Sequence, residues 1–105
     1  MTTDLIIDDV VQRLIGSFDP LKIILFGSRA RGDANPDSDW DFLVVMPDGT
    51  DRQAAAVGML KRLADLPIAK DVVVTTPQDL DRRFDDVSSV LLPAMEEGKV
   101  LHERE

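Results

Sequence analysis

Apolar residues recur every three or four positions between Thr3 and Phe18. At this spacing they share one face of a helix, which can pack on a core. Thr3 has a side chain suited to an N-cap, and Pro20 prevents a helix from continuing. We therefore predict a helix over residues 3–18, with an apolar face formed by Ile7, Val10, Val11, Leu14, Ile15 and Phe18.

Three short apolar runs rich in β-branched residues predict strands. They are Lys22–Phe26, Asp39–Met46 and Asp71–Thr75. The first run ends at Gly27, and a loop of turn-forming residues from Gly32 to Ser38 leads into the second. Runs this short and apolar are typical of strands buried in a sheet.

A second stripe of helical spacing follows the turn at residues 47–49 and ends before Pro67. It predicts a helix whose apolar face consists of Ala54, Val57, Leu60, Leu63 and Ala64. After the third strand, Thr76 and Pro77 resemble a helix start, with Thr76 as the cap and Pro77 in the first position. We predict a short helix there.

The last part of the chain is apolar enough for a helix over residues 87–97 that ends at Gly98, with Pro93 either kinking it or marking its start. Residues 99–102 are predicted as a final edge strand. Since the sequence shows no repeat and no linker, we predict one domain over residues 1–105. Its class is α/β (α+β), with a small mixed sheet flanked by helices.

Composition narrows the class of protein. Of 105 residues, 44% are hydrophobic and 30% are charged, as in folded globular domains. The absence of cysteine excludes disulfides and thiolate zinc sites and fits a reducing cytoplasm. No apolar stretch reaches membrane-spanning length and no signal peptide is recognisable, so we expect a soluble cytoplasmic protein. A formal charge of -8 disfavours tight binding to nucleic acid.

The first candidate for chemistry is Gly27-Ser28, directly after a predicted strand and before Arg29 and Arg31. Backbone amides at such a position, at the start of a short helix, can cradle phosphate. A Gly-Ser pair alone is common in turns. The two arginines are candidate phosphate ligands, although arginines among many acids also form surface ion pairs.

The second candidate is the pair Asp39 and Asp41. Side chains alternate along a strand, so both carboxylates project from one face while Trp40 points to the other, toward the core or a partner. Adjacent like charges raise each other's pKa, and Mg²⁺ relieves that repulsion while taking phosphate oxygens as further ligands. The pair predicts a metal-bound triphosphate, with an acidic, solvated edge strand as the alternative.

Asp71 begins the third predicted strand. If that strand lies beside the second, its carboxylate reaches the same cluster and supplies the third ligand that two-metal sites need. The alternative is an acid that faces solvent at the start of a strand.

The order of Gly27-Ser28, ten residues and Asp39-Trp40-Asp41 resembles the signature of the DNA polymerase beta superfamily of nucleotidyltransferases. The run from Gly27 to Val44 looks like its minimal nucleotidyltransferase (MNT) branch, and the likeness is looser at Asp71. The resemblance implies a polymerase-beta-like fold.

The same resemblance implies roles for these residues. Gly27 and Ser28 would hold the triphosphate of ATP. Asp39 and Asp41 would bind two Mg²⁺ ions, and Asp71 would bind one of them and help to deprotonate the acceptor hydroxyl. Attack on the α-phosphorus would then expel pyrophosphate.

Proteins of the MNT branch are often encoded beside all-helical HEPN proteins, and as antitoxins they transfer AMP to a tyrosine of the HEPN toxin. The resemblance therefore implies a type VII-like antitoxin that acts in a hetero-oligomer. Two alternatives stay open. One is transfer to a small hydroxylated acceptor such as an aminoglycoside, which the short chain disfavours because such acceptors need an enclosing wall. The other is a non-catalytic module that only occludes its partner.

Overall fold

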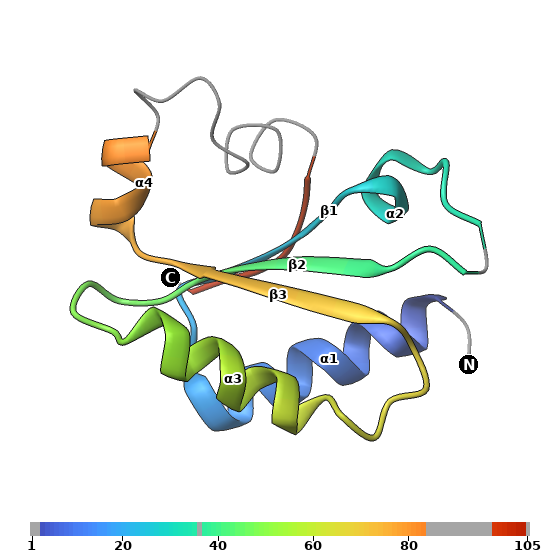
Figure 1. The fold of residues 1–105 in the computed structure, drawn as a ribbon, viewed down its shortest axis with the longest axis horizontal. Helices are drawn as coiled ribbons and strands as arrows, with labels where there is room; N and C mark the ends of the chain where they lie inside the picture. The colour runs from blue at the N-terminus through green and yellow to red at the C-terminus, as the bar shows by residue number, and fades with distance from the viewer. Residues whose placement is uncertain (1–2, 36, 84–97, 105) are drawn as a thin grey trace.

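The structure is a computed structural model, and it describes residues 3–35, 37–83 and 98–104 (Figure 1). Four helices and four strands lie in this part of the chain. In chain order they are α1 (Thr3–Phe18), β1 (Lys22–Phe26), α2 (Ser28–Arg31), β2 (Trp40–Val45), α3 (Arg52–Arg62), β3 (Lys70–Thr75), α4 (Pro77–Arg83) and β4 (Lys99–Glu103).

The strands form one mixed sheet in the order β3-β2-β1-β4. β1 pairs antiparallel with both β2 and β4, whereas β2 and β3 run parallel. The parallel pair is connected by α3, the crossover that parallel neighbours require. The predicted fold class, a small mixed sheet with flanking helices, is confirmed.

The two faces of the sheet differ. In Figure 1, α1 and α3 lie together against one face, and the main core is formed there. Trp40, Phe42 and Val44 of β2 belong to that core, as the alternation of side chains along a strand requires. The opposite face carries a smaller cluster around Ile24 and Leu43, against which Phe26, Val73 and Leu80 pack.

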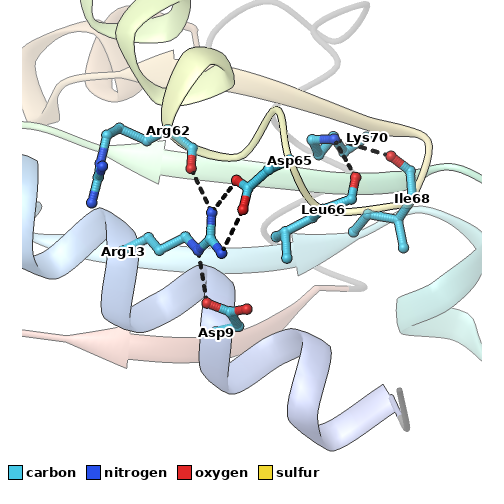
Figure 2. Close-up of polar contacts among 7 residues, drawn as sticks. All are labelled: Asp9, Arg13, Arg62, Asp65, Leu66, Ile68 and Lys70. Carbon is cyan, nitrogen blue, oxygen red and sulfur yellow. Dashed lines mark hydrogen bonds and ion pairs between the residues drawn. The ribbon is translucent and has the colours of Figure 1, made fainter.

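An arginine fastens the two covering helices together (Figure 2). Arg13 of α1 donates from Nη1 to the carbonyl oxygen of Arg62 at 3.0 Å, near the end of α3. Its guanidinium also bonds both carboxylate oxygens of Asp65 and, at 2.7 Å, Oδ1 of Asp9. Beyond Asp65, the Nζ of Lys70 donates to two loop carbonyl oxygens, those of Leu66 and Ile68, at 3.1 Å each. The segment that leads into β3 is thereby held at both ends.

Most predicted boundaries are confirmed within two residues. α1 and β1 have the predicted bounds, and Thr76 caps α4 by accepting from the amide of Asp79 at 3.2 Å. α3 begins at Arg52, where Asp51 caps it by accepting from the amide of Ala54 at 3.1 Å, and it ends at Arg62, before Leu63 and Ala64, which we predicted in this helix. Asp39 lies before β2 rather than in it. The helix predicted over 87–97 lies outside the described residues, and none of the described helices could cross a membrane.

Candidate active site

Gly27 forms the turn at the end of β1 and touches the acidic strand. Its backbone has φ 76° and ψ -160°, a region open essentially only to glycine. A Cβ atom placed on Gly27 would lie 2.5 Å from Oδ2 of Asp41, which is a clash. Glycine is therefore required twice, for the backbone conformation and for the close approach of a carboxylate.

The predicted short helix after this turn is present as α2. The amides of Ala30 and Arg31 both donate to the carbonyl oxygen of Gly27 at 3.1 Å. Gly32, in the left-handed conformation at φ 88°, ends the helix after one turn. The amides of Ser28 and Arg29 occupy the first positions of α2, where a helix supplies no acceptor of its own.

The strand register places two of the three predicted acids side by side. Asp41 of β2 is the direct partner of Asp71 in the parallel β3, so their side chains leave the same face of the sheet. Across the other neighbour, Asp41 pairs with Phe26, the residue before Gly27. The phosphate-loop candidate and the acid candidates thus meet at one end of the sheet.

The carboxylates influence one another. The pKa of Asp41 is raised above its ordinary value, first by burial and then by the negative charges of Asp39 and Asp71. The positive charge of Arg31 acts against this rise in pKa. Asp39 is exposed, while Asp41 is half-buried between the strands and the turn. These acids therefore share one electrostatic environment, and Arg31 belongs to it.

The arrangement is not a closed metal cage. Within the described part of the chain, no three His, Cys, Asp or Glu side chains stand close enough together to enclose a cation. Asp71 is exposed, and its Oδ1 accepts a hydrogen bond from the amide of the next residue, Val72, at 2.9 Å. That bond leaves the second carboxylate oxygen of Asp71, Oδ2, as a candidate metal ligand.

The residues present nevertheless suit a hard cation. The available donors are carboxylate oxygens, which Mg²⁺ prefers. The pKa of Asp41 is raised first by burial and then by the negative charges of its neighbours, which a cation would offset. Asp39 and Asp41 are the two acids best placed for this, and Asp71 lies in register beside them.

A family model for the nucleotidyltransferase domain matches residues 6–101. This chain belongs to the nucleotidyltransferase domain family. The match runs from α1 to β4 and so includes the Gly27 turn and all three acids. The polymerase-beta-like fold predicted from the sequence is thereby confirmed.

Solved structures share the fold of this nucleotidyltransferase domain. A structure assigned as a nucleotidyltransferase from Sulfolobus solfataricus is 24% identical, with a TM-score of 0.64 over 95% of this chain and 79% of its own. A toxin-antitoxin complex with AMP-PNP is 22% identical, with a TM-score of 0.59 over 94% of this chain and 74% of its own. The complex of the tri-AMPylated HEPN toxin of Shewanella oneidensis with its MNT antitoxin is 20% identical, with a TM-score of 0.57 over 98% of this chain and 74% of its own. No curated protein matches.

Trp40 lies on the opposite side of β2 from the acids, as predicted. Its side chain is only 2% exposed and stacks with Phe42, with ring centroids 6.4 Å apart. The guanidinium of Arg29 lies over the Trp40 ring, 4.3 Å from its centroid. We did not predict this contact from the sequence, although an arginine and a tryptophan that flank a turn-rich loop are a usable signal for one.

His102 is part of the sheet, because β4 pairs with β1 and brings His102 opposite Ile23. Its Nε2 is buried and has no hydrogen-bond partner in the described part of the molecule. His102 lies at the end of β1 away from Gly27, and we assign it no part in the site.

Proposed function

We propose that this nucleotidyltransferase domain transfers AMP from ATP to a hydroxyl group, and that the acceptor is a tyrosine of an all-helical HEPN toxin. In this proposal the protein is the cytoplasmic antitoxin of a toxin-antitoxin pair and forms a hetero-oligomer with its partner. The observation that carries the proposal is the contact of the Gly27 turn with Asp41, which joins a phosphate-binding turn to an acid cluster.

At the phosphate end, the first amides of α2 and the hydroxyl of Ser28 would bind the triphosphate. Such amides at the start of a helix are suited to phosphate. Because Gly27 has no side chain, the carboxylate of Asp41 can lie close to this turn. Arg31 adds positive charge beside the acids, where it would face the phosphate groups. We predicted Arg29 for the same task, but its guanidinium lies over the ring of Trp40 instead.

At the acid end, Asp39 and Asp41 would hold two Mg²⁺ ions, with Asp71 as a ligand of one. Bound magnesium would neutralise the triphosphate and polarise the α-phosphate. The carboxylates of this chain would position the magnesium ions relative to the Gly27 turn. Asp39 and Asp41 support this role, because their negative charges repel each other and a bound cation would relieve that repulsion.

The transfer itself is a substitution at phosphorus. The oxygen of the acceptor hydroxyl forms a bond to the α-phosphorus, and the bond from that phosphorus to the oxygen bridging to the β-phosphate breaks. Pyrophosphate leaves with the electron pair of that bond. The proton of the hydroxyl passes to Asp71, whose carboxylate lies in register beside Asp41.

The partner is proposed from likeness of fold. Two of the similar structures are complexes of antitoxins with toxins, one with AMP-PNP and one in which the HEPN toxin is AMPylated. The net charge of -8 fits a protein that meets another protein rather than a nucleic-acid backbone.

The experiment uses the purified chain, the HEPN-type protein of the neighbouring gene, ATP and Mg²⁺. We expect one or more AMP groups on a tyrosine of the partner, located by mass spectrometry. The variant Asp39→Asn/Asp41→Asn should lose this activity by on the order of 10³-fold or more, because it removes the charge that holds the metal ions.

Two results would contradict the proposal. If the partner is neutralised equally well by the double variant and no AMP is found on it, the protein is a binding module that occludes its partner. If AMP appears instead on a small hydroxylated molecule offered in competition, the protein is a nucleotidyltransferase but its acceptor is not the tyrosine of the partner.

A further inference from the structure

We infer that Arg29 is a positioning residue that fixes Asp39 in the metal site, and that it does not bind the triphosphate. This inference rests on the proposed function for the identity of the site. Arg29 belongs to α2, and its guanidinium lies against the loop that precedes Asp39.

Arg29 makes several contacts with one segment of the chain. Its Nε and Nη2 donate to the carbonyl oxygen of Ser38 at 3.3 Å and 3.0 Å, and Nη2 also donates to that of Asn35 at 3.4 Å. Its guanidinium covers the ring of Trp40 at 4.3 Å. Ser38 and Trp40 are the two chain neighbours of Asp39, so Arg29 holds the chain on both sides of that acid.

The loop that Arg29 holds is already folded on itself. Ser38 and Asn35 exchange two bonds, the amide of Ser38 donating to the carbonyl oxygen of Asn35 at 3.0 Å and the amide of Asn35 to Oγ of Ser38 at 3.0 Å. Oδ1 of Asn35 accepts from the amide of Asp37 at 2.9 Å. Arg29 therefore docks a preformed turn onto α2 instead of ordering a long flexible chain.

Asp39 needs such a device more than Asp41 does. Asp41 lies inside β2 and is paired on both sides, with Phe26 and with Asp71. Asp39 lies before the strand and is exposed. The residue after it, Trp40, donates from its amide to the carbonyl oxygen of Ala69, just before β3, at 2.8 Å. The sheet thus fixes Asp41 directly, while the place of Asp39 depends on the loop.

The geometry of α2 divides the two arginines. Residues two apart on a helix point about 200° away from each other. Arg31 pairs with Asp33 at 3.3 Å, and its charge also acts on Asp41. Arg29 instead reaches the ring of Trp40, on the other side of β2 from the Asp41 carboxylate. One helical turn thus has one arginine beside the acids and one behind the loop that carries Asp39.

The test compares Arg29→Ala and Arg29→Lys with Arg31→Ala, and uses Arg104→Ala as a matched control. Arg104 pairs with Asp19 at 2.7 Å and lies beside the start of β1, at the far end from Gly27. Mn²⁺ binding is measured by electron paramagnetic resonance with a non-hydrolysable ATP analogue, together with kcat and KM for ATP. Amide hydrogen exchange of Ser38 to Asp41 is followed by NMR without metal.

For Arg29→Ala we expect Mn²⁺ binding to weaken roughly 10-fold, as for residues that orient metal ligands. We further expect a lower kcat with little change in KM for ATP, and faster exchange at residues 38–41. Arg29→Lys should not rescue these properties, because lysine lacks the planar fork that bonds a carbonyl while stacking on a ring. Arg31→Ala should instead raise KM for ATP.

An Arg29→Ala variant with a raised KM, unchanged Mn²⁺ binding and unchanged exchange would overturn the inference and make Arg29 a phosphate ligand. If wild-type protein fails to bind Mn²⁺ with the nucleotide, the proposed function fails. The exchange rates still decide whether Arg29 fixes the segment around Asp39. If Arg29→Ala does not fold, Arg29→Lys, which keeps the charge and the aliphatic stem, carries the same comparison.

Discussion

The two faces of β2 place opposite chemistry on neighbouring residues. On the side of α1 and α3, Phe42 and Val44 are fully buried in the main core. On the other side, Asp41 stands half-buried between Asp71 and the Gly27 turn, with its pKa raised by burial and by neighbouring acids. The covered face has apolar contacts along its length, whereas the other face combines the small cluster around Leu43 with charges that repel one another at one end.

This contrast explains how so small a domain tolerates an unfavourable acid cluster. The repulsion is confined to one end of one face, while the covered face supplies apolar burial over the full length of the strands. Trp40 and Phe42, which face the helices, stabilise the stretch of β2 that carries Asp41. The covered face and the acid-bearing end of the other face should therefore respond differently to substitution, the first in stability and the second in activity.

The covered face should show the largest loss of stability. Leu14 of α1 is fully buried in the main core, so Leu14→Ala removes contacts and leaves a cavity. We expect the free energy of unfolding, measured with urea, to fall by about 3 kcal/mol. Below the unfolding transition, KM for ATP should change little. A large rise in KM without loss of stability would contradict the separation of the two faces.

At the boundary between the faces, Gly27→Ala should damage both properties. The methyl group would clash with Asp41 and the backbone would be strained at φ 76°, so we expect a loss of roughly 1–3 kcal/mol in unfolding free energy. Activity should fall on the order of 10²-fold, because the phosphate turn and the acids would move apart.

Gly16→Ala is the matched control for this variant. Gly16 lies in α1, a methyl group at this position would meet no atom of another element within 4 Å, and alanine favours a helix. That variant should be slightly more stable than the wild type and equally active. Equal activity of Gly27→Ala and Gly16→Ala would show that the turn is not part of the site.

The sequence predicted the elements well because their signals are local. Apolar spacing, the proline at residue 20 and the cap at Thr76 each act within a few residues, and α1 and α4 begin where predicted. The place of β4 beside β1 was not predictable, because it depends on contacts between residues about 80 positions apart, such as Lys22 with Glu103. That pairing also buries Nε2 of His102.

For the candidate site, the motif predicted which residues gather but not how they are held. Alternation along β2 correctly placed Asp41 and Trp40 on opposite faces, and the parallel neighbour β3 brings Asp71 beside Asp41 as predicted. The contact of Arg29 with the Ser38 carbonyl oxygen and the clamp of Arg13 join separate segments and leave no periodic signal.

A smaller effect is expected at the clamp between α1 and α3. Asp65→Asn keeps the shape of the side chain but removes its charge pairing with Arg13. Because the pair lies at the surface, we expect a small decrease in thermal stability that largely disappears in about 1 M salt. Glu103→Gln, from the exposed pair with Lys22 at 3.4 Å, is the control and should change stability less. A loss that persists in high salt would assign the stability to packing.

The smallest and most specific effect is a dependence of stability on pH at Asp41. Without metal and in the presence of chelator, Asp41→Asn should be more stable than the wild type at neutral pH, since it removes a desolvated charge near Asp39 and Asp71. The folded pKa is raised above 3.8, so the folded wild type binds a proton more readily than the unfolded chain. Its disadvantage should therefore shrink as the pH falls through the folded pKa and vanish below 3.8. Urea unfolding of both proteins across this range measures the difference, and Asp8→Asn, an exposed acid of α1, shows what removing any one negative charge does. A difference that stays constant with pH would mean that Asp41 is not strained by its neighbours.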